Sequence, residues 1–257
     1  MSILKAALQF AVPLPSIESF ERYMFVGPHP DDIEIGAGAT AAKLAAAGKK
    51  VAFLICTDGR YGDGNAPKGL SPAELAELRK KEAQRSAALL GAEEPQFLDL
   101  SDGGFYEDSQ LLEKLAKVVG QWKPDMIFAP DPSVTNECHA DHLNVGKAVR
   151  QLACFAPYAG IMAQYGAESA PIKALGFYMT AKPNRYVKTR GFLERQRQAI
   201  FQCHVSQFPA GAPESRALDT YLKLRAYDYG LRSLKGCAEG FRVLGTTHMH
   251  CLPEFGD

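Results

Sequence analysis

Two clusters of histidine and carboxylate residues, far apart in the sequence, have the composition of a catalytic metal site. The first runs from Pro28 to Asp32 and reads PHPDD, and the second runs from Glu137 to His142 and reads ECHADH. Together they supply two imidazoles and a carboxylate for a metal ion, with further histidine and carboxylate groups left over. A structural zinc site fills its positions with protein ligands, whereas a catalytic site leaves one position open for water. Because zinc hydrolases need a carboxylate to take the proton of that water, the surplus favours a hydrolytic centre.

Folding must bring these clusters together, and the apolar segments of the chain indicate how. Four short apolar runs are typical of buried strands, and they span 23–26, 51–56, 96–98 and 125–130. Helical patterns alternate with them over 40–47, 72–90, 110–122 and 140–155. The second of these helices has the clearest boundaries, with Ser71 as N-cap, Glu74 three residues later and Gly91 after its end. The alternation predicts a parallel sheet with helices on both faces.

The predicted topology puts both clusters at one edge of the sheet. In a doubly wound sheet of order 3-2-1-4-5, the first and fourth strands are neighbours, and ligands bind beyond their carboxyl ends. His29 follows the first predicted strand, and His139 and His142 follow the fourth. Ligand chemistry and sheet topology therefore indicate the same crevice.

The chain after residue 155 is organised differently. An irregular link over 157–171 precedes strands at 174–180, 185–187 and 241–244 and helices at 194–203 and 214–234. This region either extends the sheet or covers the crevice. We therefore expect an α/β fold with a Rossmann-like, doubly wound, mainly parallel sheet and a C-terminal α+β extension. A single domain over residues 1–257 is expected to consist of a core of about 22–156 and an extension of about 157–257.

One long loop, from Asp58 to Leu70, contains four glycines and follows the second predicted strand. Loops of this length are uncommon and often functional. Its position predicts that it overhangs the crevice, and a plain solvated loop is the alternative.

The composition excludes several classes of partner. Lys plus Arg and Asp plus Glu both number 29, so there is no electrostatic case for binding nucleic acid or an anionic membrane. No apolar run is long enough to span a bilayer, and Pro13 and Pro15 interrupt the mildly apolar start of the chain, so a signal peptide is not expected.

The six cysteines form no C-x-x-C pair and are typical of free thiols in a reducing compartment, which predicts a cytoplasmic protein.

In order and context, the two histidine motifs resemble those of the LmbE-like (PIG-L) family of zinc-dependent N-deacetylases, which remove acetyl groups from N-acetylglucosamine linked to various aglycones. Supporting segments also resemble the family, including its bacillithiol- and mycothiol-type branch. They are Thr57 to Gly59, the helix from Leu78 to Glu82, Asp102 with Gly103, and His204 to Gln207.

The resemblance implies a role for each residue of the two motifs. His29, Asp32 and His142 would bind Zn²⁺, or another divalent metal such as Fe²⁺. Asp31 would be the general base, and His139 would stabilise the oxyanion or protonate the leaving amine, with Asp141 orienting it. Arg79 and Asp102 would bind sugar hydroxyls. The substrate would be a small-molecule amino sugar, and an assembly of identical chains is left open.

Each of these residues also has a purely structural interpretation. His29 would cap the following helix, Asp31 or Asp32 would be an N-cap, and Asp141 would be the N-cap of the helix over 140–155. Without the family, Arg79 is an ordinary charge on a helix surface. His204 alone is more often structural. His248 and His250 form either a second metal site or part of an exposed tail.

Two rival functions stay open. One is a zinc hydrolase of another amide or of an ester. The other is a non-catalytic Rossmann-like protein that binds a sugar or nucleotide, which the segment from Gly36 to Gly38 suggests. That glycine spacing is incomplete, however, and Asp31 and Asp32 would repel a pyrophosphate. A measurement of bound metal separates a metal hydrolase from the non-catalytic binding protein, because the binding protein is expected to hold none.

Overall fold

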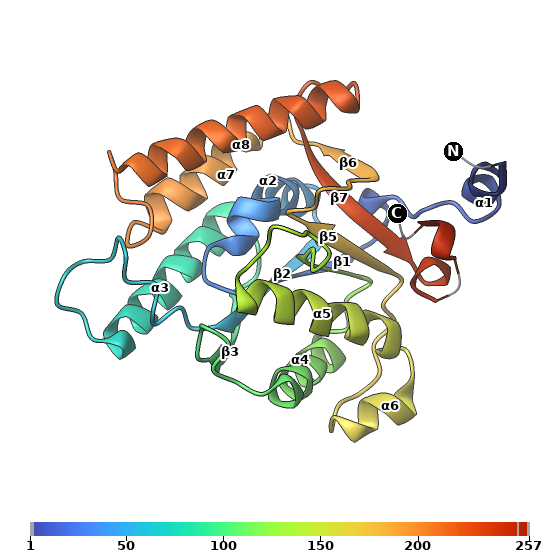
Figure 1. The fold of residues 1–257 in the computed structure, drawn as a ribbon, viewed down its shortest axis with the longest axis horizontal. Helices are drawn as coiled ribbons and strands as arrows, with labels where there is room; N and C mark the ends of the chain where they lie inside the picture. The colour runs from blue at the N-terminus through green and yellow to red at the C-terminus, as the bar shows by residue number, and fades with distance from the viewer. Residues whose placement is uncertain (1–2, 251, 256–257) are drawn as a thin grey trace.

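The computed structural model describes residues 3–250 and 252–255, and a seven-stranded sheet runs through its centre (Figure 1). The strand order is β3-β2-β1-β4-β5-β7-β6. The strands are β1 (Arg22–Gly27), β2 (Lys50–Thr57), β3 (Gln96–Leu100), β4 (Met126–Pro130), β5 (Ala174–Tyr178), β6 (Arg185–Lys188) and β7 (Ala238–Gly245). Strands β1 to β5 are parallel, and β7 is antiparallel to both β5 and β6. The expected order 3-2-1-4-5 and the α/β fold class are confirmed.

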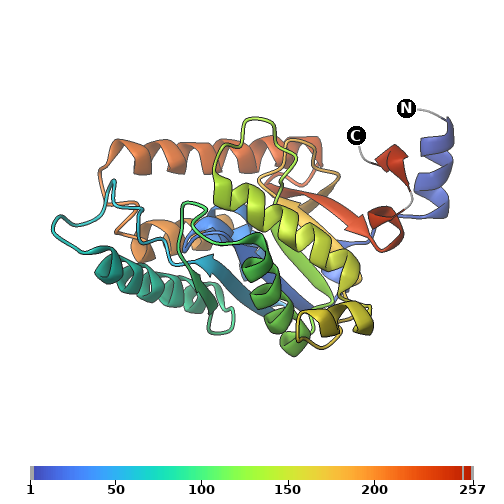
Figure 2. The same ribbon diagram turned by 60° about the horizontal axis from the view of Figure 1, so that its bottom comes forward.

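Helices cover both faces of this sheet, as a doubly wound fold requires (Figures 1 and 2). They are α1 (Ile3–Ala11), α2 (Asp32–Ala46), α3 (Pro72–Leu90), α4 (Asp108–Trp122), α5 (Ala140–Phe155), α6 (Ala159–Gln164), α7 (Leu193–Gln198) and α8 (Pro213–Arg232). Helices α2 and α3 pack on one face, where α7 lies against α2 and α8 lies against β7, and α4 and α5 pack on the other face. Short 3-10 turns lie at Ile17–Ser19, Thr247–Met249 and Pro253–Phe255, and a π-helical turn, η2, spans Ala199–Cys203.

The hydrophobic core forms two layers, one on each side of the sheet. The layer under α2 and α3 includes Phe25 of β1 and Phe128 of β4, whose rings stack with centroids 4.4 Å apart. The other layer lies under α4 and α5. Because β1 and β4 pair in register from Tyr23 and Met126 onward, their carboxyl ends come out side by side. That pairing positions the two histidine motifs.

Local signals explain where the predicted helices agree with the structure and where they do not. Helices α3 and α5 have the expected bounds, and α3 has a capping box between Ser71 and Glu74. Helix α2 begins at Asp32, eight residues before the expected start at Thr40, because glycines at 36 and 38 obscure its first turns. The expected helix over 194–203 is α7 followed by η2. Helix α1 was not predicted, and α6 lies within the expected irregular link.

The C-terminal region both extends the sheet and reaches the crevice, the two possibilities that the sequence left open. Strands β7 and β6 extend the sheet beyond β5, and the segment after η2 contributes Gln207 and Phe208 to the lining of the cavity described below. The single domain over residues 1–257 stays a prediction, and the unbroken sheet supports it. No helix in the described part of the chain has the length and hydropathy to cross a bilayer. The five described cysteines are free thiols, and Cys251 lies outside the described residues.

Candidate metal and catalytic site

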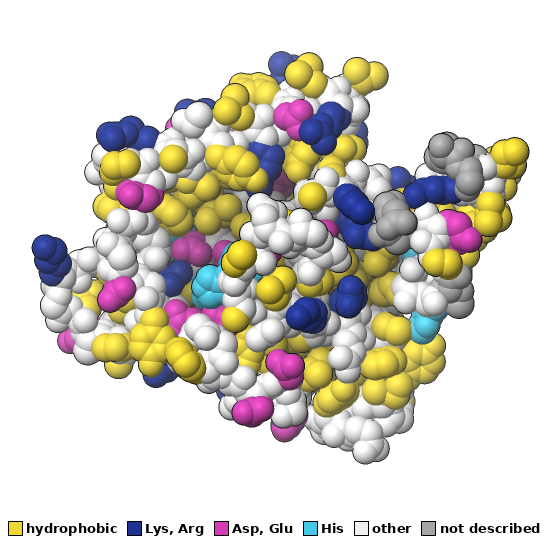
Figure 3. Space-filling model, viewed as in Figure 1, with side chains coloured by type: hydrophobic (Ala, Val, Ile, Leu, Met, Phe, Trp, Pro, Cys, Tyr) yellow, Lys and Arg dark blue, Asp and Glu magenta, His cyan; other side chains and the backbone are white. Residues whose placement is uncertain are grey.

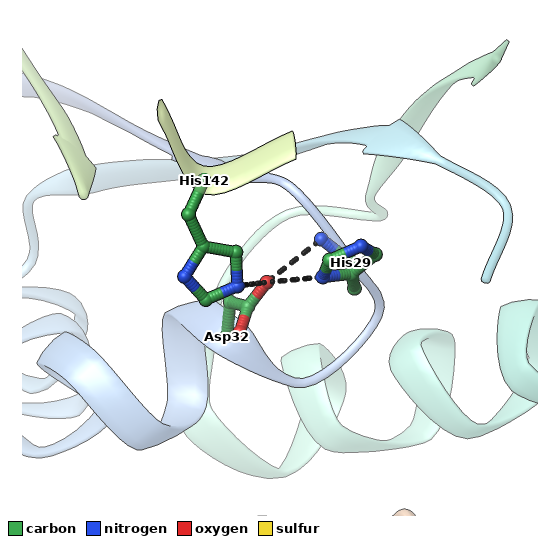
Figure 4. A group of neighbouring side chains, drawn as sticks. All are labelled: His29, Asp32 and His142. Carbon is green, nitrogen blue, oxygen red and sulfur yellow. Dashed lines mark hydrogen bonds and ion pairs between the residues drawn. The ribbon is translucent and has the colours of Figure 1, made fainter. Parts of the chain in front are cut away.

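The two histidine motifs meet at the carboxyl ends of β1 and β4. His29 lies in the turn between β1 and α2, Asp32 is the first residue of α2, and His142 lies in the first turn of α5. Oδ2 of Asp32 lies 3.0 Å from Nδ1 of His29 and 3.3 Å from Nε2 of His142 (Figure 4). One atom from each of the three residues falls within 4.8 Å of the others. The structure therefore brings together the three expected metal ligands.

Each imidazole of this group is also held from behind by a second carboxylate. Nε2 of His29 lies 2.9 Å from Oδ2 of Asp141, and Nδ1 of His142 lies 3.0 Å from Oε2 of Glu137. Metal-binding histidines commonly donate their second ring N–H to a carboxylate, which fixes the tautomer and raises the basicity of the ligand. Both histidines thus have the surroundings of metal ligands.

The charges in this group are tightly balanced. Burial opposes ionisation of Asp32, yet the two imidazoles hold the pKa of its carboxyl well below the usual range. Burial lowers the pKa of His29, but its bonds to Asp141 and Asp32 outweigh burial and raise that pKa to about 10. For His142, the Asp32 carboxylate likewise outweighs burial and raises the pKa to about 9. The carboxylates around the two imidazoles thus favour positive charge at this site, which suits a divalent cation.

Asp141 is fixed by the backbone of the loop after β3. Its two carboxylate oxygens accept hydrogen bonds from the N–H groups of Gly103, at 2.7 Å, and Gly104, at 2.8 Å. Both glycines have positive φ, of +85° and +77°, which other residues rarely adopt. Although burial opposes ionisation, the bond to His29 and the N–H of Gly103 lower the pKa of Asp141 to about 2. Asp141 is therefore an anionic support for His29.

Asp31 lies beside the metal ligands but faces a different partner. Its Oδ2 accepts a hydrogen bond of 3.0 Å from Nη2 of Arg79. Asp31 occupies the N-cap position of α2, but its side chain makes no capping hydrogen bond to the helix, and its φ of 150° is strained for a non-glycine residue. Burial raises the pKa of Asp31 to about 6, against the lowering effect of Arg79. A carboxyl with such a pKa is suited to exchanging a proton near neutral pH.

Arg79 is not the surface charge that its helix alone suggests. Its side chain is only 5% exposed, and its guanidinium also donates to the carbonyl oxygens of Gly59 and Pro30. The guanidinium thus ties the turn of the first motif to the loop after β2.

His139 is exposed at the rim of the site. It is the N-cap of α5, since its Nδ1 accepts a hydrogen bond of 3.3 Å from the N–H of Asp141. The N-cap therefore lies two residues before Asp141, the residue at which the sequence had suggested it. Its ring centroid lies 4.6 Å from that of His29 and 5.1 Å from that of His142. Burial and these two imidazoles lower the pKa of His139, and the opposing effect of Asp141 is smaller.

A cavity of about 460 Å³ opens over these residues. Figure 3 shows histidine and acidic side chains together in a hollow on this face of the molecule. Its lining consists of His29, Asp31, Asp32, Ile35, Tyr61, Gly62, Arg79, Asp102, Gly103, Phe105, His139, Gln207 and Phe208. The loop over 58–70 contributes two of these residues, as expected for a loop that overhangs the crevice. The carboxylate of Asp102 accepts hydrogen bonds from the N–H of Tyr61.

The three histidines outside the two motifs play different parts. His204 is fully buried, with Nε2 3.2 Å from Oε1 of Glu34. Nδ1 of His248 accepts from the N–H of Gly245, and Nε2 lies 3.1 Å from the carbonyl oxygen of Val12, so this side chain joins the two ends of the described chain. His250 lies against Cys154. The metal-ligand groups found among the described residues include neither His248 nor His250.

Sequence reasoning did not assign several residues of the site. Glu137 was visible as a spare carboxylate five positions before His142, a spacing that allows contact across a helix start. Tyr61 and Phe105 line the cavity from loops, and no motif marks them, whereas Gln207 belongs to the segment from His204 that resembles the family.

The family profile described as GlcNAc-PI de-N-acetylase (PIG-L) matches residues 24–153. A diacetylchitobiose deacetylase from Thermococcus kodakarensis is 31% identical over 255 residues, 98% of this chain and 93% of that protein. A 1D-myo-inositol 2-acetamido-2-deoxy-alpha-D-glucopyranoside deacetylase from Rhodococcus erythropolis is 30% identical, over 74% of this chain and 67% of that protein.

A solved structure of N,N'-diacetylchitobiose deacetylase from Pyrococcus horikoshii, in complex with an inhibitor, superposes with a TM-score of 0.85 at 28% identity. The match covers 97% of this chain and 96% of that one. The expected enzyme class, a deacetylase that hydrolyses an N-acetyl amide, agrees with these relatives. The chain therefore belongs to the PIG-L family of N-deacetylases.

Proposed function

We propose that this protein is a zinc-dependent hydrolase that removes the N-acetyl group from a small N-acetylglucosamine conjugate. The observation that carries the proposal is an open three-donor group, His29, Asp32 and His142, with the separate carboxylate of Asp31 beside it in one cavity. A zinc ion held by two imidazoles and one carboxylate keeps a position for water, which is the arrangement of zinc hydrolases.

The donor set suits the metal. His29 would bind through Nδ1 and His142 through Nε2, because Asp141 and Glu137 engage their other ring nitrogens. A second group, His29 with His139 and Asp141, suits it less, since Asp141 already accepts two backbone N–H groups. The ion would lower the pKa of a bound water to about 7 and polarise the amide carbonyl. Fe²⁺ is the alternative metal.

Asp31 is the proposed general base. Its carboxylate is held by Arg79, and its pKa near 6 leaves it ionised at neutral pH, ready to accept a proton from the attacking water. The ion pair with Arg79 fixes the direction of the carboxylate, and a fixed base removes the need to reorganise during the reaction.

His139 is the proposed group that faces the tetrahedral oxyanion or protonates the leaving amine. It lines the cavity beside His29, and when protonated it would donate a hydrogen bond to the developing charge. We assign Asp141 chiefly to His29, since its carboxylate is 2.9 Å from that ring and 3.7 Å from Nδ1 of His139.

Arg79 and Asp102 line the same cavity and are the proposed contacts for sugar hydroxyls. The names of the relatives support an acetamido sugar as the substrate. The neutral charge balance and the free cysteines support a soluble conjugate handled in the cytoplasm. We further propose that residues 1–257 act as one domain.

Substrate profiling tests this function. Purified zinc-loaded protein would be incubated with N-acetylglucosamine, N,N'-diacetylchitobiose and an N-acetylglucosaminide of inositol, while free amine and acetate are followed. We expect equimolar release of both products, abolished by a chelator and restored by zinc. Bound metal with turnover only of unrelated amides or esters would favour the rival hydrolase, and a protein that binds sugar but no metal would favour the non-catalytic alternative.

A further inference from the structure

Two large aromatic side chains stand exposed at the mouth of the active-site cavity. Phe105 is 72% exposed and Tyr61 is 53% exposed. Their rings meet edge to face, with centroids 6.0 Å apart and planes at 84°. Both residues line the same cavity as His29 and Asp31. Apolar rings left in water at a cavity mouth are surface that a ligand would bury with a gain in free energy.

The backbone on each side of this pair is firmly attached to the polar part of the site. The N–H of Tyr61 donates to the carboxylate of Asp102, and the next residue, Gly62, accepts a hydrogen bond of 2.9 Å from Nε2 of Gln207. Phe105 follows the two glycines whose N–H groups bind Asp141. The backbone that carries the two rings is thus fixed before any ligand arrives, which reduces the entropy cost of binding.

Only a small residue fits beneath the ring of Phe105. A Cβ atom at Gly103 would lie 3.0 Å from that ring, and the φ of +85° at Gly103 already requires glycine. The same glycine therefore serves both Asp141, through its N–H, and Phe105, through its missing side chain.

The cavity lining combines charged and apolar side chains. The aromatic pair shares it with the carboxylates of Asp31 and Asp102 and with the apolar side chains of Ile35 and Phe208. Arg60, next to Tyr61, is paired with the carboxylate of Asp58, so it offers no free charge to a ligand. The two exposed rings carry no charge, so they are suited to a neutral group with an apolar face.

We propose that Tyr61 and Phe105 form a platform on which the ring attached to the acetamido sugar stacks, so that the preferred substrate is a neutral disaccharide-like conjugate rather than free N-acetylglucosamine. This inference rests on the proposed function. A sugar ring presents one face of C–H groups, and such a face packs against an aromatic ring while the hydroxyls at its edge stay in water. Tyr61 and Phe105 then determine specificity without taking part in the chemistry.

Kinetics on two substrates test the platform. The zinc-loaded wild type and the variants Phe105→Ala and Tyr61→Ala would be compared on N-acetylglucosamine and N,N'-diacetylchitobiose. We expect the wild type to favour the disaccharide. Each variant should lose roughly three- to tenfold in kcat/KM for the disaccharide, the size of an aromatic contact, and change less than about twofold for the monosaccharide. Equal losses on both substrates, or no loss on either, would overturn the proposal.

Matched variants separate the ring from other effects. Tyr61→Phe keeps the ring and removes the hydroxyl, so it should retain the preference for the disaccharide. Tyr227→Ala removes an equally exposed aromatic side chain, 57% exposed on α8, and should change neither substrate. If Phe105→Ala fails to fold, Phe105→Leu keeps an apolar side chain but no flat face, and the same loss is expected.

Binding measurements distinguish a failure of the platform from a failure of the proposed function. In an Asp31→Asn background, calorimetry would compare the binding of the intact disaccharide with and without Phe105→Ala. Weaker binding of the disaccharide in the Phe105→Ala variant supports the platform, whether or not the wild type releases amine. Failure of the wild type to release amine would reject only the proposed function. If Phe105→Ala instead changes the sedimentation of the protein and leaves disaccharide binding unchanged, the pair is a contact between copies of the chain and the proposal is wrong.

Discussion

Nε2 of His29 lies 2.9 Å from Oδ2 of Asp141, although the sequence motif suggests that Asp141 serves its near neighbour His139. The distance from the same carboxylate to Nδ1 of His139 is 3.7 Å. Two backbone N–H groups fix Asp141 in this position. The carboxylate therefore belongs to the support of a proposed metal ligand.

Asp141→Asn should weaken zinc binding by roughly 10- to 100-fold, the usual cost of losing such an outer carboxylate. Titration of the metal-free protein against a competing chelator measures this affinity. Asp219→Asn is the control. It changes a carboxylate on α8 that pairs with Arg197 and does not line the cavity, so this variant should bind zinc normally. Unchanged zinc affinity combined with an altered pH profile of activity would mean that Asp141 supports His139 rather than His29.

His142→Ala should abolish stoichiometric metal binding. The variant removes one of three donors and leaves Asp32 with a single imidazole partner. Metal analysis of purified protein should give about one zinc per chain in the wild type and almost none in the variant. His250→Ala is the matched control, because that histidine lies against Cys154, outside the candidate groups. Full occupancy in the His142 variant would reject the ligand set.

Asp31→Asn should keep its metal and lose activity. The amide cannot accept the proton of the attacking water, and the loss of a general base typically costs roughly 10²- to 10⁴-fold in rate. Parallel measurement of zinc content and amine release checks both halves of the expectation. Near-normal turnover with full zinc would place the base elsewhere.

The sequence predicted most reliably what depends on local signals. Helix α3 has a capping box at Ser71 and an αL glycine at its end, and both are visible in the sequence. The meeting of His29 and His142 followed from topology, since strands before the two motifs had to be neighbours. The start of α2 was missed because glycines weaken the helical pattern.

Contacts between distant loops were beyond reach of the sequence. Asp141 is 112 positions from His29, and adjacency along the chain favoured His139 instead. The burial of Arg79 depends on the loop after β2 folding over it, which a helical pattern does not reveal. Tyr61 and Phe105 come from two loops without a motif, and only the folded chain brings their rings together.

Arg79→Met should move the acidic limb of the kcat/KM profile to higher pH. Asp31 must be ionised to act as a base, so activity rises as pH increases through its pKa. Burial raises that pKa to about 6, and Arg79 lowers it. Loss of the cation should raise it further, by roughly one to two units. A bound metal acts on Asp31 in both proteins, so the difference between them remains. Arg79→Lys keeps the charge and should shift the acidic limb less. If the limb does not move in Arg79→Met, the ion pair between Arg79 and Asp31 does not set the pKa of the base.

His139→Ala should lower the rate, keep the zinc and remove the alkaline limb. His139 must carry a proton to face the oxyanion, so activity falls as pH increases through its pKa. Burial together with His29 and His142 lowers that pKa, and a bound cation would act in the same direction. Because the pKa of Asp31 is raised while that of His139 is lowered, the two limbs lie close together and the bell-shaped profile is narrow. The variant should lose roughly 10²- to 10³-fold in kcat, typical of an oxyanion donor, and its profile should rise to a plateau. An alkaline limb that persists unchanged in His139→Ala would mean that another group, such as the metal-bound water, sets it.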